Sequence, residues 1–346
     1  MDEGKLQAFF VSAREPKFRL SQAEKAVYGQ LISSWDEATT FPYELRTKLM
    51  TAVPMSSLEV VREVASTRGD TTKVAFKLAD GNVIETVLMQ HYGERNTVCV
   101  SSQAGCPMKC SFCATGTMGL KRNLTTEEIV DQVLHFGRML KSRSERVTNM
   151  VFMGMGEPMH NYDNVMAACR ILNDQKGFSL GARHISISTC GIVAGINRMA
   201  DEDLQVNLAI SLHAPNDEMR TRMMPVNRAY PIAKLMASVE AYIQKTKRKV
   251  MFEYLLIKGW NDSLETADEL ATLMTYPLYH VNLIKYHTTD VPGEGVLETS
   301  PREQRSAFMD RLMKKGVSVT HRITFGEDID AACGQLANKE TKLSAG

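Results

Sequence analysis

The sequence predicts an α/β fold in which a parallel sheet or barrel is covered by helices. From Thr97 onward, short apolar β-rich runs alternate with helical stretches, which is the pattern of consecutive βαβ units. The 346 residues suffice for one large α/β domain with a small one attached. A hydrophobic content of 44% and a charged content of 23% are typical of a soluble globular protein.

The N-terminal part is expected to differ from this pattern. Residues from about 5 to 65 carry apolar side chains at helical spacing and few β-rich runs, so we expect helices there. An accessory hairpin is expected next. Lys73–Leu78 alternates between polar and apolar residues, Asp80-Gly81 supplies a turn, and Val83–Met89 forms the second strand.

The core is expected to contain seven strands separated by helices. The strands are expected at Val98–Val100, Met150–Met153, His184–Ser188, Val206–Ser211, Val250–Ile257, His280–Tyr286 and Val317–Ile323. The helices are expected at Thr125–Leu140, Asn161–Asn173, Ala233–Gln244, Ser263–Met274 and Arg302–Lys315. In barrels of this kind, functional residues lie at the C-terminal ends of the strands.

These patterns divide the chain into four parts. We expect a helical accessory module at 1–70, the hairpin with a linker at 71–96, the core at 97–337 and a flexible tail at 338–346. Positive charge gathers within 219–250 and 302–322. Contact with nucleic-acid phosphates explains such clusters, and solvated helix faces explain each of them equally well.

The cellular location is predicted from what the sequence contains and lacks. No run of eighteen apolar residues occurs, so we expect no membrane span and no membrane partner. The first seven residues are acidic and polar, unlike a signal peptide. Seven cysteines, an odd number, then indicate reduced thiols and a cytoplasmic location.

The most informative motif is a loop with thiols at Cys106, Cys110 and Cys113, directly after the first core strand. A structural zinc site needs four closed ligands, often as paired Cys-x-x-Cys elements. A four-iron cluster held by three thiolates instead leaves one iron open for another ligand. The second core strand ends in Gly154-Met-Gly-Glu-Pro158, where glycines allow close approach to a ligand and a carboxylate can accept bonds from an ammonium group.

At this point the chain resembles the radical S-adenosylmethionine superfamily, through the three cysteines and the aromatic Phe112 before the third of them. The resemblance implies a partial (β/α)6-type barrel. It also implies that Cys106, Cys110 and Cys113 hold a [4Fe–4S] cluster whose open iron binds S-adenosylmethionine. Gly156 and Glu157 then match the segment that holds the methionine amino group.

A narrower resemblance, covering about residues 15 to 337, is to the RlmN/Cfr family of RNA adenine methyltransferases. The motifs are Asn123–Ile129, Gly154–Pro158, Ser211-Leu212-His213, Met224–Asn227, Val281–Ile284 and Gly326–Leu336. The last is the most specific, because it contributes a cysteine far from the cluster loop. By this resemblance Cys333 carries the methyl group as S-methylcysteine. Cys99 releases the product by forming a transient disulfide with Cys333, and Glu85 accepts the proton.

The resemblance also implies further contacts to S-adenosylmethionine, of which two molecules are used per turnover. Ser188, Ser211, Leu212 and His213 match the expected strand ends. The family usually has asparagine three residues after Val281–Ile284, whereas this chain has His287, which can also donate or accept a hydrogen bond. Cys169 is expected to be a core residue and Cys190 to pack near the site.

The implied partners are 23S rRNA, tRNA for the carbon-2 branch of the family, and an electron donor such as flavodoxin. A buried reaction centre must receive a base taken out of its stack. Pro158 favours carbon 2 of adenine, and Cys113-Ala-Thr-Gly116 favours carbon 8. We expect carbon 2, because those enzymes are far more widespread. The alternatives are the carbon-8 resistance enzymes, another radical enzyme such as an activase or methylthiotransferase, and a non-catalytic metal-binding RNA protein.

Overall fold

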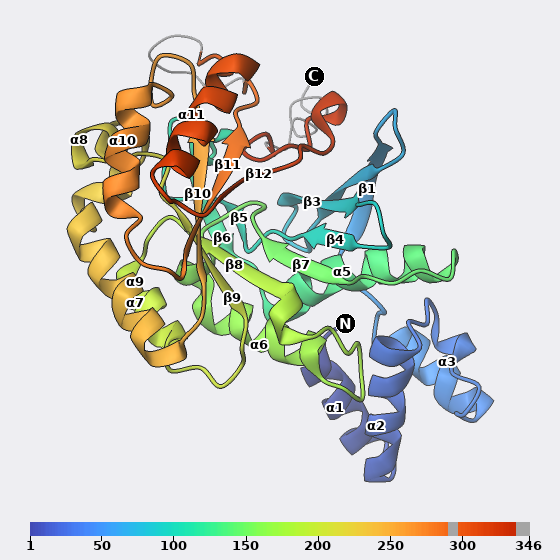
Figure 1. Ribbon diagram of the computed structural model, residues 1–346. Coiled ribbons are helices and arrows are strands. Elements are labelled where there is room, and N and C mark those ends of the chain that lie inside the picture. Colours follow the sequence, from blue (N-terminus) through green and yellow to red (C-terminus); the bar gives the residue numbers. More distant parts are fainter. Residues whose placement is uncertain (290–296, 337–346) are drawn as a thin grey trace.

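A computed structural model describes residues 1–289 and 297–336. Its centre is a ten-stranded mixed sheet in the order β1-β2-β3-β4-β7-β8-β9-β10-β11-β12, with the first strands on the right in Figure 1. Seven neighbouring strands of this sheet run parallel. They are β4 (Asn96–Cys99), β7 (Asn149–Phe152), β8 (Ile185–Thr189), β9 (Asn207–Ser211), β10 (Val250–Leu256), β11 (Tyr279–Lys285) and β12 (Val319–His321).

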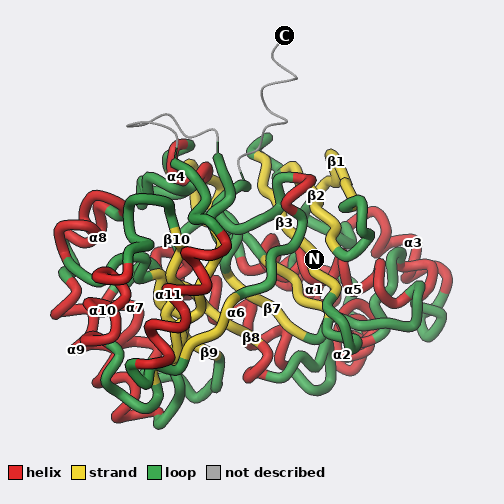
Figure 2. The backbone as a smooth tube through the Cα atoms, turned by 45° about the horizontal axis from the view of Figure 1, so that its top comes forward, coloured by secondary structure: helices red, strands yellow, loops and turns green. Residues whose placement is uncertain are grey.

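Helices follow six of these strands and cover the outer face of the sheet, as the red tubes around the yellow strands of Figure 2 show. The helices are α5 (Thr126–Lys141), α6 (Tyr162–Asn173), α7 (Val193–Met199), α8 (Asp217–Met223), α9 (Ile232–Thr246), α10 (Leu264–Leu273) and α11 (Arg302–Lys314). Six strand–helix units followed by β12 confirm the predicted partial barrel. Within the described residues β12 pairs only with β11, so the sheet stays open at that edge.

The predicted core elements recur within a few residues of their expected positions. The helices at Thr125–Leu140 and Asn161–Asn173 correspond to α5 and α6, for example, and both bury an apolar stripe against the sheet. The short helices α7 and α8 were not expected from the sequence. Each has only seven residues, which is too short for a clear helical period.

The helical module is shorter than expected. It contains α1 (Glu3–Ser12), α2 (Lys17–Glu24) and α3 (Tyr43–Ala52). The prediction of helix up to about residue 65 is wrong for the last stretch, because β1 (Glu59–Ala65) is a strand that pairs antiparallel with β2 (Thr71–Lys77). This edge strand is almost entirely exposed, so it lacks the alternation of buried and polar residues that marks a strand.

The accessory hairpin is consequently a three-stranded accessory sheet, β1–β3, joined to the core. β3 (Val83–Gln90) pairs antiparallel with β2 and with the first core strand β4. The register places Lys73, Val87 and Cys99 side by side on the three strands β2, β3 and β4. Because side chains alternate along a strand, Glu85 lies on the same face as Val87 and Cys99. The accessory sheet therefore presents Glu85 on the face that also carries Cys99.

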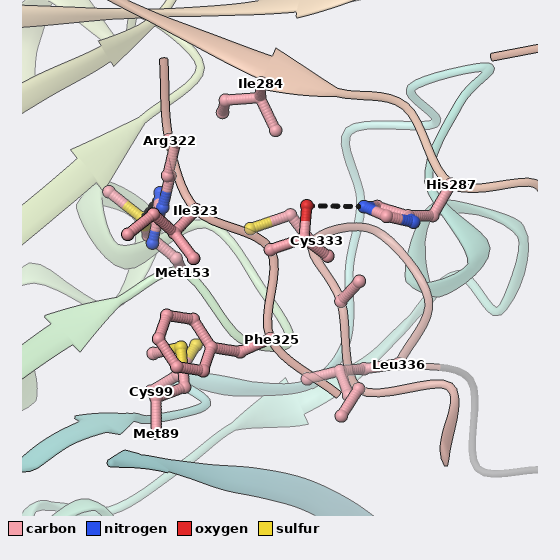
Figure 3. Close-up of a pocket in the computed structure, with 13 residues that line it drawn as sticks. Met89, Cys99, Met153, Ile284, His287, Arg322, Ile323, Phe325, Cys333 and Leu336 are labelled. Carbon is pink, nitrogen blue, oxygen red and sulfur yellow. Dashed lines mark hydrogen bonds between the residues drawn. The ribbon is translucent and has the colours of Figure 1, made fainter. Parts of the chain in front are cut away.

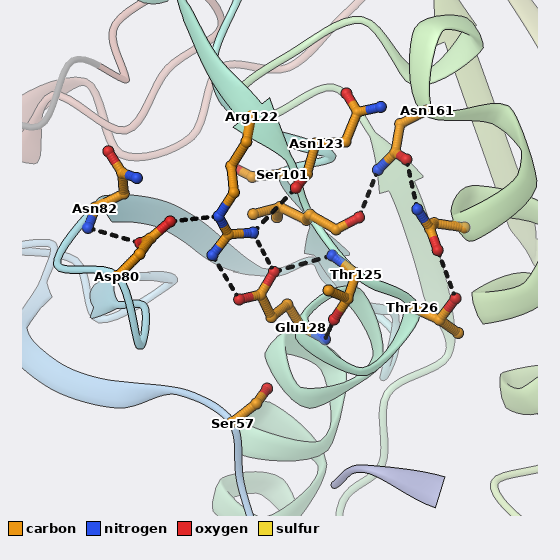
Figure 4. A network of polar contacts seen from close by, with 12 residues as sticks. Ser57, Asp80, Asn82, Ser101, Arg122, Asn123, Thr125, Thr126, Glu128 and Asn161 are labelled. Carbon is orange, nitrogen blue, oxygen red and sulfur yellow. Dashed lines mark hydrogen bonds and ion pairs between the residues drawn. The ribbon is translucent and has the colours of Figure 1, made fainter. Parts of the chain in front are cut away.

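A polar network joins this sheet to the start of the core (Figure 4). Arg122 donates two hydrogen bonds to Glu128, at 2.7 and 2.8 Å, and a third to Asp80 in the turn between β2 and β3. Glu128 also completes a capping box with Thr125 at the start of α5. The bond from Arg122 lowers the pKa of Asp80 to about 2. One guanidinium thus connects the accessory sheet, the strand after the thiol loop and the first core helix.

Two further points concern the ends of the chain and the membrane. The expected flexible tail at 338–346 lies outside the described residues. Within the described residues, none of the helices combines the length and the apolar character that a membrane crossing requires.

Candidate active site

The thiol loop is closed at its base by a small two-stranded sheet. β5 (Gln103–Gly105) pairs antiparallel with β6 (Leu120–Asn123), and the loop between them carries the three cysteines and the short helix α4 (Ala114–Thr117). Gly105 has a φ of +74°, and a Cβ atom there would lie 1.9 Å from the carbonyl oxygen of Gly119. Only glycine allows the two ends of the loop to approach this closely.

This close approach predicts that Gly105→Ala disrupts the loop. We expect the variant to hold severalfold less iron per chain after anaerobic reconstitution, because the methyl group would push Gly119 away and separate the thiols. Gly81→Ala is the matched control, since Gly81 also has a positive φ, +83°, but no atom lies within 4 Å of the added Cβ. Iron content is measured by colorimetric assay. Full iron content in Gly105→Ala would contradict the prediction.

The three thiols of the loop line one cavity at the C-terminal ends of the parallel strands, with about 820 Å³ of space that no atom fills. Burial raises the pKa of Cys110 well above its ordinary value, and the neighbouring Cys113 and Cys106 raise it further. A positively charged cluster would remove this penalty by binding the thiolates. Among the described residues, no three His, Cys, Asp or Glu side chains are placed to hold a single metal ion. Three thiols that line one cavity are the kind of donor set that an iron–sulfur cluster uses.

Glu157 lies in this cavity beyond the end of β7, where the strand gives way to the glycine-containing turn. Its carboxylate accepts hydrogen bonds from the backbone N–H groups of Cys190 at 2.8 Å and Met159 at 2.9 Å. Two backbone bonds fix its orientation, and a carboxylate has further lone pairs for an ammonium group. Gly156, with a φ of +103°, leaves no room for a Cβ because the atom would lie 2.6 Å from Gln103.

The predicted strand-end residues divide into two groups. Ser188 and Ser211, at the ends of β8 and β9, line the cavity with their hydroxyl oxygens 3.4 Å apart. His213 lines it too and packs edge-on against Phe112 at 4.8 Å between ring centres. Leu212 does not line the cavity, because its side chain is fully buried in the core.

His213 is a neutral imidazole. Its Nδ1 accepts a hydrogen bond from the backbone N–H of Leu255 at 3.1 Å, and burial, followed by the charge of Arg220, lowers its pKa to about 3. The residue also has a φ of +59°, a left-handed conformation in which His and Asn are enriched. His213 therefore has a structural hydrogen bond and a cavity-facing ring at the same time.

This buried imidazole predicts how stability depends on pH. In the unfolded chain this histidine has its ordinary pKa of 6.5, so it binds a proton as the pH falls below that value. In the folded chain its pKa is about 3, so it stays neutral over the same range and the folded state loses stability as the pH falls. We expect the wild type to lose about 1.4 kcal/mol per pH unit more than His213→Asn between roughly pH 6 and 4. Anaerobic urea unfolding measures this, and parallel curves for both proteins would contradict it.

A second cavity adjoins the first and contains the remaining two candidate thiols (Figure 3). Cys99 reaches it from the end of β4, and Cys333 reaches it from the C-terminal segment after β12. Four residues line both cavities, namely Met153, Ile284, Arg322 and Cys333. Both cysteines are free thiols in the structure. Tertiary folding has thus brought together two thiols that are 234 positions apart in the sequence (333 minus 99).

The electrostatics of this second cavity are set by Arg322. Burial raises the pKa of Cys99 to about 12, the nearby Cys333 adds to this effect, and Arg322 opposes it. Burial lowers the pKa of Arg322 itself, but Cys333, Glu253 and Cys99 raise it, and the net shift is upward. The Arg322 guanidinium therefore stays positively charged beside the carboxylate of Glu253, and it lines the cavity together with the two thiols.

The remaining two predicted site residues lie outside the first cavity. His287 lines the second cavity, where its Nε2 lies 3.3 Å from the hydroxyl of Thr324 and its Nδ1 lies 3.3 Å from the carboxylate of Glu327. The structure therefore does not bring it together with Glu157 and Ser188. Glu85 is buried on β3 and pairs with Lys73 at 3.3 Å, on the same face as Cys99, but it lines neither cavity.

Sequence reasoning missed two charged residues of the site. Glu253 is buried in β10 and lines the first cavity. It accepts a hydrogen bond from Asn282 at 3.0 Å with one oxygen and lies 3.6 Å from Arg322 with the other. Its position inside the apolar run Val250–Ile257 was a usable signal, because an unpaired charge is rarely buried in a strand. Arg322 had no such signal, since it lies among other basic and polar residues near the end of the chain.

The open parallel barrel, together with a three-thiol loop after its first strand, defines the class of radical S-adenosylmethionine enzymes. The family model described as "Radical SAM superfamily" matches residues 100–271. Membership of this class implies a [4Fe–4S] cluster and S-adenosylmethionine. Cys190, which lines the cavity, and the buried Cys169 take the positions expected for them in the site and the core.

Comparison with individual proteins narrows the class. The chain is 47% identical over 338 residues to the probable dual-specificity RNA methyltransferase RlmN of Geobacillus thermodenitrificans, covering 97% of this chain and 91% of that protein. It is 46% identical to the protein of the same name from Bacillus cytotoxicus, covering 97% and 92%. A crystal structure of a radical SAM methyltransferase from Sphaerobacter thermophilus matches with a TM-score of 0.92 and 44% identity, covering 97% of each chain. The chain belongs to the RlmN family of radical SAM RNA methyltransferases.

Proposed function

We propose that this enzyme methylates carbon 2 of an adenosine in 23S rRNA and in tRNA, with Cys333 as the carrier of the methyl group. The observation that supports this most directly is the position of Cys333. It is the one candidate thiol that lines both the cavity of the cluster loop and the cavity of Cys99. A methyl carrier must reach both the methyl donor and the acceptor base. The names of the relatives, which specify RNA and dual specificity, support the substrate class.

The proposed roles of the residues follow from their positions. Cys106, Cys110 and Cys113 would hold the cluster, and Gly156, Glu157, Ser188 and Ser211 would hold S-adenosylmethionine. When bound, the cluster and two molecules of S-adenosylmethionine per turnover supply the methyl group and a 5′-deoxyadenosyl radical. The Cys333 sulfur would accept the methyl group as its thiol proton leaves. The 5′-deoxyadenosyl radical would then take a hydrogen atom from this methyl group, and the remaining methylene carbon would bond to the adenine carbon.

Two residues would complete the reaction. The Glu85 carboxylate accepts the proton from the substituted adenine carbon, a role for which a buried carboxylate near the base is suited. The sulfur of Cys99 then bonds to the sulfur of Cys333 as the bond between Cys333 and the methylene carbon breaks. The electron pair of that bond goes to the carbon, which takes up a proton to become the methyl group. The second cavity, which both cysteines line, is the place for this exchange.

The test is to map methylated adenosine in RNA. The chain is expressed in a bacterial host that lacks its own RNA adenine methyltransferases, and rRNA and tRNA are digested to nucleosides and analysed by mass spectrometry. We expect 2-methyladenosine in both RNAs. Finding 8-methyladenosine would replace our proposal with the carbon-8 reaction, and finding neither would reject RNA methylation. Zinc in place of iron in the anaerobically reconstituted protein would reject the radical mechanism.

A further inference from the structure

The C-terminal segment that carries Cys333 has little regular structure of its own. Among its described residues, which end at 336, the helical turn is Glu327–Ile329, and both Gly326 and Asp330 have left-handed backbone conformations. On one side, the segment bonds to the cluster loop, where Ala114 donates to the carbonyl of Gly334 at 2.8 Å. A segment of this kind is held in place by what it touches. The position of Cys333 therefore depends on its partners.

The other side of this segment rests on the accessory sheet, next to which the dark red end of the chain lies in Figure 1. The carboxylate of Asp328 accepts hydrogen bonds from the backbone and the hydroxyl of Thr67, at 2.7 and 2.8 Å, in the turn between β1 and β2. The Nζ of Lys73 on β2 donates to the carbonyl oxygen of Asp330 at 3.1 Å. These contacts join the accessory sheet to the segment three residues before Cys333.

Lys73 has a second partner. Its ammonium group lies 3.3 Å from the carboxylate of Glu85 on the neighbouring strand, and the two side chains are only 15% and 4% exposed. One ammonium group thus contacts both the proposed proton acceptor and the segment that carries the proposed methyl carrier. A lysine has three N–H donors, so it can bond to both at once. The ammonium group is also the cation that pairs with this buried carboxylate.

We propose that Lys73 is a positioning residue that holds the Glu85 carboxylate in a fixed relation to Cys333. This inference rests on the proposed function, in which Glu85 accepts a proton from the adenine carbon bonded to Cys333 through the methylene group. In that transfer the C–H bond breaks, the proton bonds to a Glu85 oxygen, and the electron pair of the bond stays in the purine ring. The unpaired electron left by the radical addition would return to the oxidised iron–sulfur cluster. Lys73 takes no part in bond making and fixes where the proton acceptor lies.

The test compares Lys73→Met with Lys73→Arg and with a matched control. Lys77→Met is the control, because Lys77 lies four residues further along β2 and pairs with Glu59 at 3.5 Å on the exposed part of the strand. Three quantities are measured in the reconstituted enzyme: methylation of Cys333 by mass spectrometry, the covalent RNA–protein adduct on denaturing gels, and the methyladenosine formed.

We expect Lys73→Met to methylate Cys333 as the wild type does and to accumulate the adduct. Methyladenosine formation should fall by about 10- to 100-fold, the usual cost of removing a residue that orients a functional group. Glu85→Gln should show the same accumulation, and Lys73→Arg should restore most of the product. Deuterium on the target carbon should slow the breakdown of the adduct in Lys73→Met more than in the wild type, which a purely structural role would not produce.

Asp328→Asn distinguishes the Thr67–Asp328 contact from the Lys73–Asp330 contact. It weakens the bonds from Thr67 and leaves the ion pair between Lys73 and Glu85 unchanged. We expect no accumulation of adduct in this variant. Wild-type product formation in Lys73→Met, or loss of Cys333 methylation without accumulation of adduct, would overturn the inference. If Lys73→Met does not fold, Lys73→Gln, which also removes the charge but keeps a polar side chain, is measured in its place against the same outcomes. A wild type that forms neither methylated Cys333 nor an adduct would refute the proposed function itself.

Discussion

Cys333→Ala is expected to abolish RNA methylation while leaving the fold and the cluster intact. The loss should be on the order of 10⁴- to 10⁶-fold, as for other enzymes that lose the side chain forming the covalent intermediate. The fold should survive because Cys333 is only partly buried, in a segment whose Gly334 and Asp330 carbonyls accept hydrogen bonds from Ala114 and Lys73. Product is measured as radioactive methyl groups transferred from S-adenosylmethionine to RNA, and iron content is measured in parallel.

Two comparisons make the Cys333→Ala result specific. Cys169→Ala removes a buried thiol of α6 that lines neither cavity, and it should leave methylation at the wild-type level. Cys99→Ala should still carry a methyl group on Cys333 but should retain RNA as a covalent adduct, because the releasing thiol is missing. Residual methylation within tenfold of the wild type in Cys333→Ala would show that the methyl group reaches RNA by another route.

Arg322→Met is expected to lower the free energy of unfolding by about 3 kcal/mol, because it leaves the carboxylate of Glu253 buried without its cation. The two side chains are 25% and 4% exposed, and Glu253 keeps only the hydrogen bond from Asn282. Adding Glu253→Gln to the variant removes the unpaired charge, so the double variant should recover most of the loss. Urea unfolding under anaerobic conditions measures all three proteins.

The matched control for this prediction is Arg311→Met on the outer surface of α11. Arg311 pairs with Asp268 at 2.6 Å, but the two side chains are 43% and 34% exposed, so the loss should stay below about 1 kcal/mol. If Arg322→Met and Arg311→Met have the same free energy of unfolding, the guanidinium of Arg322 does not stabilise the buried Glu253 carboxylate, and the prediction is wrong. Failure of Glu253→Gln to restore stability would mean that the packing of Arg322 against Met153, with Nη1 2.9 Å from Sδ, matters more than its charge.

The radical SAM class and most of the core were predictable from the sequence because their signals are local. The period of apolar residues is read within ten or fifteen positions, and α5 and β10 follow it closely. The three thiols lie within eight positions of one another, so their grouping survives without knowledge of the fold. Where a local signal was weak, the prediction was wrong. β1 was predicted as helix because nearly all of its residues, including its valines, are exposed. Its sequence therefore lacks the alternation of apolar and polar residues that indicates a strand.

The sequence by itself determined the order of strands and helices, the thiol loop and the family, since each of these depends on neighbouring residues or on short motifs. Only the tertiary structure decided that Cys333 lines both cavities, that Arg322 stands beside Glu253, and that Lys73 reaches both Glu85 and Asp330. The physical reason is the same in each case. A lysine or arginine looks the same in a sequence whether its side chain lies in water or beside a buried carboxylate. Here Lys73 is 12 positions from Glu85 (85 minus 73) and 257 positions from Asp330 (330 minus 73). Arg322 is 69 positions from Glu253 (322 minus 253).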